Sequence, residues 1–418
     1  PPSQFYSNKP LVSLLLFFHQ KSRSEISMLV ANNEQLLMHL LWPRTLLLLI
    51  MTLAVLPNPT QSLAADSASI TTTTTNYNNN NNIQLGTLTN VAPVALGSLN
   101  LFREENVNLQ DILDKLPSGT LIDTAELYKG NNNQESAESS LCLGLSSSNN
   151  KQVYLATKFA PQLFRTTSES VVEACKASCE RLGVDSIDLY QMHYSDSCVN
   201  QLSFLRLGAK NKDDMDPVYW EGLAQCYHEG LVKNVGVCNY GPTKIRRAHA
   251  ALSDLGVPLV SNQISYNLLR YGVTRETKEI CDELQVKVLS YSPLSKGVLS
   301  GKYDPNDERT LKPLYNTAGG SSIGGTGGGV SGKYFRIKRC LKATHELRDT
   351  LNQVAKAHNL PWPQIIYQWH VRQGTLPIAG AQDVSQVNDM LIQQGLDWSL
   401  TKEEEEALTA LACHNLSP

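Results

Sequence analysis

The sequence lacks a surplus of basic charge, and it lacks long hydrophobic runs. Its 418 residues include 36 lysines and arginines against 39 aspartates and glutamates, which gives a formal net charge of −3. Proteins that bind nucleic acid through their overall charge are strongly basic, so the charge argues against a nucleic-acid partner. No apolar run reaches the ~18 residues that a membrane-spanning helix needs, and we therefore expect no stable membrane span in the mature protein.

The sequence also lacks closely paired cysteines. Nine cysteines are present without a Cys-x-x-Cys pair, and the nearest two, Cys175 and Cys179, are four residues apart. Disulfide scaffolds and structural zinc sites need closer pairs, so we predict neither, and no metal site. With 41 % hydrophobic residues the chain can bury a large core, and its length allows one to three domains.

The first 91 residues have the composition of processing and linker segments. Residues 1–65 do not begin with Met, as in a fragment or a translated leader, and from Met38 they follow the order of a signal peptide. Arg44 supplies positive charge and the apolar stretch 46–56 follows, which is too short for a membrane anchor. Residues 66–91 are rich in Thr and Asn, and such polar low complexity predicts a disordered linker or transit segment.

Eight short apolar runs indicate the architecture of the remaining chain, 92–418. They alternate with helix-like stretches, which is typical of a parallel sheet covered by helices on both faces. Eight such units fit a (β/α)8 TIM barrel, and we predict this α/β fold as a single catalytic domain behind a disordered N-terminal extension. The predicted strands are 94–97, 121–123, 153–158, 187–193, 234–238, 259–263, 286–291 and 376–380. The helix-like stretches include 168–182, 218–229, 242–252, 274–284 and 341–358.

The sequence lacks the glycine-rich fingerprint that would follow the first strand of a doubly wound dinucleotide-binding fold. Eight glycines do occur within 319–332, but they precede no strand-turn-helix unit. We predict a flexible glycine-rich insertion near 304–335, after the seventh strand.

Polar residues follow the predicted strands at the end where barrel enzymes collect their catalytic groups. Core packing explains Val, Ile or Leu at such places, but it does not explain an acid, a lysine, a histidine and two amides. The residues are Asp123 with Tyr128 beyond it, Lys158, His193, Cys238 with Asn239, Gln263, and Tyr291 with Ser292. Their joint occurrence at successive strand ends predicts an active site.

Four of these residues have the chemistry needed to reduce a carbonyl group. A tyrosine hydroxyl delivers a proton when a cation lowers its pKa, and Lys158 would be that cation for Tyr128. Asp123 would keep Lys158 charged, and a neutral His193 would donate a hydrogen bond to the carbonyl oxygen. Because no side chain donates hydride, this chemistry also requires a hydride-donating cofactor.

A nicotinamide cofactor would find partners at three further strand ends. Asn239 and Gln263 could bind its carboxamide, and the ring of Tyr291 could stack on its face. A zinc ion would need several converging His, Cys or carboxylate ligands, and the set offers one His and one Cys.

These segments resemble the aldo-keto reductase family, in the same order, from about Val94 to the C-terminus. The matching segments read IDTAELY (122–128), LATK (155–158), DLYQMH (188–193), GLVKNVGVCN (230–239), SYSPL (290–294) through GKY (301–303), and PIAGA (377–381). The resemblance implies a (β/α)8 barrel, NADP(H) as cofactor, and a catalytic tetrad of Asp123, Tyr128, Lys158 and His193. The cofactor-binding positions it implies are Cys238, Asn239, Gln263, Tyr291, Ser292, Leu294, Lys302, Gly380, Gln382 and Gln386.

Three positions depart from the family's pattern. Cys238 replaces the usual Ser before the nicotinamide-binding Asn, and it is a weaker hydrogen-bonding group. Gln382 stands where many relatives have a basic residue that would grip the 2′-phosphate by charge. Met390 stands where an Asn is expected near the adenine. NAD(H) therefore stays open as an alternative to NADP(H).

We predict an NADP-dependent aldo-keto reductase that reduces an aldehyde or ketone to an alcohol by hydride transfer, with Tyr128 as general acid. Its substrate would be a small carbonyl compound, and we expect a monomer. Two alternatives stay open: a sugar or polyol dehydrogenase that runs the reaction in reverse, and a non-catalytic cofactor-binding regulatory subunit.

The N-terminal segment and the globular part together favour a location in a plastid. Unpaired thiols, such as that of Cys238, suit an oxidising lumen poorly, and a reductase needs reduced cofactor. In algae with complex plastids, a signal peptide followed by a Thr-rich, acid-poor extension leads through the endoplasmic reticulum to the plastid. Residues 65–82 contain five consecutive threonines and one acid, Asp66, but no basic residue. We predict a plastid location, with secretion or the endomembranes as the alternative.

Overall fold

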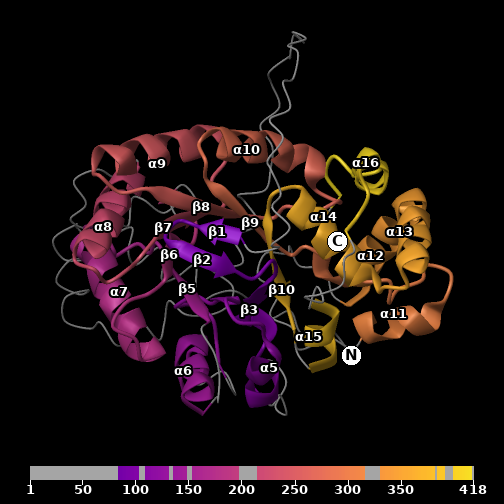
Figure 1. Cartoon of the computed structure of the whole chain (residues 1–418), viewed down its shortest axis with the longest axis horizontal. Coiled ribbons are helices and arrows are strands. Elements are labelled where there is room, and N and C mark those ends of the chain that lie inside the picture. The colour runs from indigo at the N-terminus through magenta and orange to yellow at the C-terminus, as the bar shows by residue number, and fades with distance from the viewer. Residues whose placement is uncertain are drawn as a thin grey trace, which may run out of the picture. The chain divides into compact units, whose positions relative to one another are not determined.

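Eight parallel strands close into a barrel in the computed structural model, which describes residues 83–102, 109–130, 135–147, 153–196, 214–315, 330–381, 384–390 and 399–416 (Figure 1). The strands are β3 (Ala95–Gly97), β4 (Leu121–Asp123), β5 (Tyr154–Phe159), β6 (Leu189–Met192), β7 (Val235–Cys238), β8 (Leu259–Ile264), β9 (Lys287–Tyr291) and β10 (Leu376–Gly380). Each strand pairs with the next, and β10 closes the barrel by pairing with β3. The predicted (β/α)8 fold is confirmed.

Helices follow the strands and surround the barrel (Figure 1). They are η1 (Ser98–Asn100), α5 (Leu109–Lys115), α6 (Ala137–Ser147), α7 (Glu169–Leu182), α8 (Asp216–His228), α9 (Pro242–Asp254), α10 (Tyr271–Glu283), η5 (Ser295–Gly297), α11 (Glu308–Tyr315), α12 (Val330–Ala343), α13 (His345–His358), α14 (Trp362–Arg372), α15 (Val384–Met390) and α16 (Lys402–Ala410). The stretch predicted as one helix over 341–358 is divided, because Thr344 leaves the helical backbone conformation between α12 and α13.

The barrel strands are buried on both faces, which explains why they read as apolar runs. All six residues of β8 and all four of β7 are buried. The surrounding helices cover the outer face with apolar stripes, such as Val171, Cys175 and Leu182 of α7. Polar side chains are therefore costly inside this barrel unless they are hydrogen-bonded.

A short hairpin, β1 (Ile83–Leu85) and β2 (Leu88–Val91), is drawn across the middle of the barrel in Figure 1. Its buried Leu85 and Leu88 pack in one cluster with the first residues of several barrel strands. Asn234 fastens the hairpin, since its Oδ1 accepts a hydrogen bond from the backbone N–H of Thr87 at 2.9 Å. The hairpin thus covers the N-terminal ends of the strands and leaves their C-terminal ends as the place for a site.

The prediction of a disordered linker over 66–91 is wrong for its last nine residues, which form this hairpin. Residues 83–91 are a folded part of the barrel, because Leu85, Leu88 and Val91 supply apolar surface that the strand starts bury. Exposed polar residues, Gln84, Thr89 and Asn90, interrupt its apolar positions, so the hairpin lacks the continuous apolar runs that marked the barrel strands. Residues 66–82 and the predicted signal-peptide region 1–65 lie outside the described residues.

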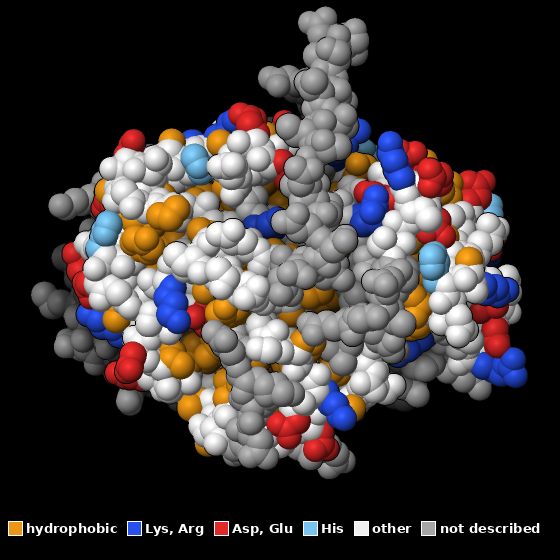
Figure 2. Space-filling model, viewed as in Figure 1, with side chains coloured by type: hydrophobic (Ala, Val, Ile, Leu, Met, Phe, Trp, Pro, Cys, Tyr) orange, Lys and Arg blue, Asp and Glu red, His pale blue; other side chains and the backbone are white. Residues whose placement is uncertain are grey.

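The predicted insertion near 304–335 includes the turn at 304–307, α11 and the first residues of α12. Its glycine-rich centre, 316–329, lies outside the described residues. No helix in the described part of the chain is long and apolar enough to cross a membrane. On the face shown in Figure 2, the acidic and basic side chains are interspersed and lie mostly toward the rim.

Candidate active site

A buried ion pair lies at the C-terminal ends of β4 and β5. The Nζ atom of Lys158 donates hydrogen bonds to Oδ2 of Asp123 at 2.6 Å and to the backbone carbonyl of Thr124 at 2.8 Å. Lys158 is completely buried and Asp123 is 3 % exposed. The pairing that the sequence predicted between these two residues is confirmed.

Asp123 keeps the buried lysine charged. Burial is the largest single effect and disfavours the ammonium form, but the charge and hydrogen bond of Asp123, together with Tyr128 and Cys238, outweigh it, and the pKa of Lys158 is raised above its ordinary value. Removing one partner of such a pair leaves an uncompensated buried charge, which costs about 3–5 kcal/mol. The site therefore contains a permanent positive charge at neutral pH.

Tyr128 lies beside this charge on the turn after β4. Its hydroxyl is 3.5 Å from Nζ of Lys158, and the ammonium lies 5.0 Å from the centre of its ring. The turn is closed by a hydrogen bond from the Tyr128 N–H to the carbonyl of Ala125 at 2.9 Å.

The net direction of the Tyr128 pKa differs from the sequence-based expectation. Burial raises the pKa, and this effect is larger than the lowering that the charge of Lys158 causes. The sequence showed the cation but not the burial of the phenol. The hydroxyl therefore keeps its proton at neutral pH and is available as an acid.

His193 contacts Tyr128 at the open end of the barrel. The two rings meet edge to face, with their centres 5.6 Å apart. Burial, aided by the charge of Lys158, lowers the pKa of His193 to about 3, so the imidazole is neutral, as expected. Its Nδ1 atom is buried and has no hydrogen-bond partner among the described residues.

Two amides complete the surroundings of Asp123 from inside the barrel. Gln263 on β8 donates from Nε2 to Oδ1 of Asp123 at 2.8 Å, and Gln191 on β6 donates to the same oxygen at 3.4 Å. The thiol of Cys238 donates to Oε1 of Gln191 at 3.7 Å. Gln191 was not among the residues expected at the site, although an amide in the middle of the predicted buried strand 187–193 was a usable signal.

Asn239 and Tyr291 lie together beside His193. The amide nitrogen of Asn239 donates to the His193 carbonyl at 3.1 Å, and its Oδ1 accepts from the Tyr291 hydroxyl at 2.9 Å. The backbone of Asn239 is left-handed, with φ of 62°. Non-glycine residues adopt this conformation at a cost, and it is concentrated at functional sites.

The loop after β9 has the same unusual backbone. Ser292, Ser295 and Lys296 have φ values of 54°, 49° and 56°. Hydrogen bonds from Ser295 N–H to the Ser292 carbonyl and from Gly297 N–H to the Leu294 carbonyl, at 2.9 and 3.0 Å, close the loop. Backbones that alternate between right- and left-handed turns present N–H groups to anions.

The other predicted cofactor residues lie on separate segments. Lys302 is exposed in the loop that follows η5, Gly380 is the exposed last residue of β10, and Gln386 is half-buried on α15. Gln382 lies outside the described residues.

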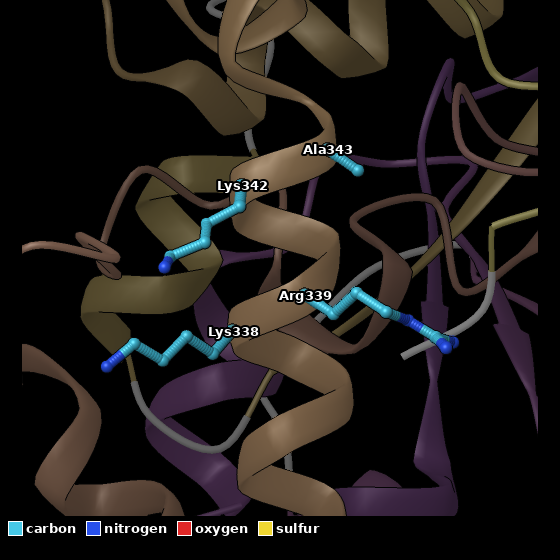
Figure 3. A pocket seen from close by; sticks show the side chains of 4 residues that line it. All are labelled: Lys338, Arg339, Lys342 and Ala343. Atoms are coloured by element: carbon cyan, nitrogen blue, oxygen red, sulfur yellow. The ribbon is translucent and has the colours of Figure 1, made fainter.

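A shallow hollow of about 580 Å³ lies on α12, away from the strand ends (Figure 3). It is lined by Lys338, Arg339, Lys342 and Ala343. Lys338 forms an ion pair with Glu308, and Figure 3 shows Arg339 pointing to the other side of the helix from Lys338 and Lys342. The hollow contains no strand-end residue, so it is not the candidate active site.

The described residues also contain no group of three or more His, Cys, Asp or Glu that could hold a metal ion.

Known proteins similar to this chain match it over most of the barrel. The family model described as "Aldo/keto reductase family" matches residues 95–412. The chain is 35 % identical to a chloroplastic pyridoxal reductase of Arabidopsis thaliana over 74 % of this chain and 73 % of that protein. It is 24 % identical to an NADPH-dependent alpha-keto amide reductase of Saccharomyces cerevisiae, over 71 % of this chain and 76 % of the relative.

Solved structures show the same fold. An aldo-keto reductase of Bombyx mori in complex with NADP superposes with a TM-score of 0.53 at 21 % identity, covering 79 % of this chain and 92 % of that one. The thermostable aldo-keto reductase Tm1743 superposes with a TM-score of 0.55 at 18 % identity, covering 79 % and 98 % of the two chains.

Because two buried histidines have lowered pKa values, we expect the protein to lose stability in mild acid. Burial lowers the pKa of His370 to about 3, as it does for His193. Below the ordinary histidine pKa of about 6.5 the unfolded chain takes up protons that the folded chain cannot bind, so the free energy of unfolding falls as pH falls from about 6.5 toward 3. Each histidine contributes up to about 1.4 kcal/mol per pH unit in this window.

Urea unfolding at pH 7, 6 and 5 measures this dependence. We expect His193→Gln to weaken it and His345→Gln, at an exposed histidine of α13, to leave it unchanged. Equal pH dependence in the wild type and His193→Gln would show that folding does not lower the pKa of His193.

Proposed function

Because this chain belongs to the aldo/keto reductase family of oxidoreductases, we propose that it reduces an aldehyde or ketone to an alcohol, with NADP(H) as hydride donor and Tyr128 as general acid. The observation that carries this proposal is the series of contacts from Asp123 through Lys158 to the Tyr128 hydroxyl, at 2.6 and 3.5 Å. It lies at the end of the barrel where this class of fold carries its catalytic groups.

The proton is handled by residues of this chain. Tyr128 transfers its hydroxyl proton to the carbonyl oxygen of the substrate, and the Lys158 ammonium stabilises the phenolate that remains. Asp123 holds Lys158 charged and in place. The neutral imidazole of His193 has one N–H and one acceptor nitrogen, and its N–H orients the carbonyl oxygen.

The residues around the site fit a nicotinamide cofactor, which supplies hydride to the carbonyl carbon when it is bound. Asn239 is exposed, and its amide nitrogen and oxygen can each make one further hydrogen bond, as a carboxamide requires. The half-buried ring of Tyr291 offers a stacking surface. The left-handed loop that contains Ser292 and Leu294 offers N–H groups for the diphosphate.

Pyridoxal is the first carbonyl to test as substrate. Support comes from the relative named pyridoxal reductase, which is 35 % identical to this chain in an alignment that covers 73 % of the relative. The panel also includes sugars, short aldehydes and quinones, and the matching alcohols with oxidised cofactor test the reverse direction. Loss of the nicotinamide absorbance with any member distinguishes an enzyme from a cofactor-binding subunit.

Tyr128→Phe removes the proposed acid and keeps the ring. We expect kcat to fall by about 10²–10⁴, with little change in cofactor affinity, because the stacking partner is Tyr291. Lys158→Met should be at least as damaging, since it removes the charge that stabilises the phenolate. Steady-state kinetics on the best substrate measure both variants.

Tyr154→Phe is the matched control, because its hydroxyl binds the Thr89 carbonyl at the opposite end of the barrel. Its kcat should stay within about twofold of the wild-type value. Full turnover in Tyr128→Phe would mean that another group donates the proton.

The choice between NADPH and NADH is proposed to depend on Gln382, which replaces a basic residue of many relatives. We expect only a modest preference for NADPH in the wild type. Gln382→Arg should tighten NADPH binding by about 1.5–3 kcal/mol through a charge-assisted bond to the 2′-phosphate, and leave NADH nearly unaffected. Fluorescence titration of both cofactors measures this, and equal changes would show that residue 382 does not face the 2′ position.

A plastid location is proposed from the N-terminal segment and from the relative named chloroplastic. A fluorescent tag on the C-terminus, with residues 28–90 retained, should direct the fusion to plastids in a plastid-bearing host. Fluorescence confined to the medium or the endomembranes would contradict this location and leave the reductase proposal untouched.

A further inference from the structure

The turn that carries Tyr128 is anchored by an ion pair that the proposed proton transfer does not use. Glu126 lies two residues before Tyr128, and its side chain is 7 % exposed. Arg165 donates to both of its oxygens, from Nη1 to Oε1 at 2.5 Å and from Nη2 to Oε2 at 3.0 Å. Such two-point pairs of arginine and carboxylate hold a defined geometry.

Arg165 is held in one position by its own surroundings. Its Nη1 also donates to the carbonyl of Ala160 at 3.0 Å, and its guanidinium lies 5.0 Å from the ring centre of Phe159. Its carbonyl accepts a hydrogen bond from the Tyr219 hydroxyl at 2.7 Å. Burial lowers the pKa of Arg165, but the hydrogen bonds and charge of Glu126, with smaller effects of Tyr190 and Tyr194, together outweigh it, so the pKa is raised and the guanidinium stays charged.

The ion pair connects the proton donor to the cation through the backbone. Oε1 of Glu126 accepts a hydrogen bond from the N–H of Ala160 at 2.6 Å, and Ala160 is two residues after Lys158. Glu126 and Tyr128 belong to the same short turn, which the Tyr128–Ala125 hydrogen bond closes. A shift of Glu126 therefore changes the distance between the Tyr128 hydroxyl and the Lys158 ammonium.

We propose that Glu126 and Arg165 are positioning residues that hold the Tyr128 hydroxyl at its 3.5 Å separation from Lys158. The inference rests on the proposed function, because the separation matters only if Tyr128 transfers the proton. A displacement of about 1 Å in a reacting group can cost on the order of a hundredfold in rate. Neither residue touches the substrate in this scheme.

The chain offers a matched control pair. Arg246 of α9 and Glu283 of α10 form a second two-point ion pair, with distances of 2.9 and 2.6 Å. Their side chains are 46 % and 59 % exposed, on the outer helices. The test variants are Arg165→Met, Arg165→Lys, Glu126→Gln and the double variant that combines Arg165→Met with Glu126→Gln. The control variants are Arg246→Met and Glu283→Gln.

We expect Arg165→Met and Glu126→Gln to lower kcat about tenfold, with the KM for NADPH within about twofold of wild type. The double variant should lose no more than the worse single variant, because both changes remove the same contact. Arg165→Lys keeps the charge without the forked geometry and should restore part of kcat. A kcat of Arg165→Met within twofold of Arg246→Met overturns the proposal.

The pH profile distinguishes positioning from a general effect on folding. The charge of Lys158 lowers the pKa of Tyr128, so a wider separation should move the alkaline limb of kcat to higher pH in Arg165→Met and not in Arg246→Met. A limb that stays in place means that the ion pair is only structural. A limb that moves to lower pH means that the turn opens to water. Either result overturns the proposal.

The same shift is measured without substrate by NMR titration of carbon-13-labelled tyrosine, in which the Tyr128 signal is identified by its absence from Tyr128→Phe. Arg165→Met should raise the pKa of Tyr128 relative to wild type and to Arg246→Met. This measurement decides on the ion pair even if the protein reduces no carbonyl in the panel, a result that would overturn the proposed function instead.

Discussion

The buried ion pair between Lys158 and Asp123 is the constraint on which the candidate site depends. A fully buried ammonium loses its hydration, and the structure offsets that loss with the Asp123 carboxylate at 2.6 Å and the Thr124 carbonyl at 2.8 Å. Both acceptors come from the end of β4, next to β5, which carries the lysine. The parallel pairing of these two strands therefore sets the position of the charge.

The interior of the barrel continues this polar network across other strands. The second oxygen of Asp123 accepts from Gln263 on β8 and Gln191 on β6, and Cys238 on β7 donates to Gln191. The opposite end of the same barrel is apolar and covered by the β1–β2 hairpin. The two ends of the barrel therefore differ in role. The N-terminal end buries apolar area that stabilises the fold, and the C-terminal end holds a site with fixed charges.

Much of the fold was predictable from the sequence. All eight barrel strands lie within two residues of the predicted ranges, because parallel strands buried on both faces read as apolar runs. The strand-end positions of Asp123, Lys158, His193 and Asn239 followed from those ranges. The hairpin at 83–91 was mistaken for linker because exposed polar residues interrupt its apolar positions. The boundary between α12 and α13 depends on the backbone of one residue, Thr344.

The sequence by itself determined the order of the elements and the residue types at the strand ends, since both are local properties of burial and composition. The pairing of Asp123 with Lys158 was expected from the charges of the two residues, but only the tertiary structure decided the contacts around it. Gln263 donates to Asp123 across 140 residues, and Arg165 pairs with Glu126 across 39. It also decided the direction of the Tyr128 pKa, because that direction depends on how burial of the phenol compares with the charge of Lys158. Contacts and desolvation are set by closure of the barrel, and no local pattern of residues encodes them.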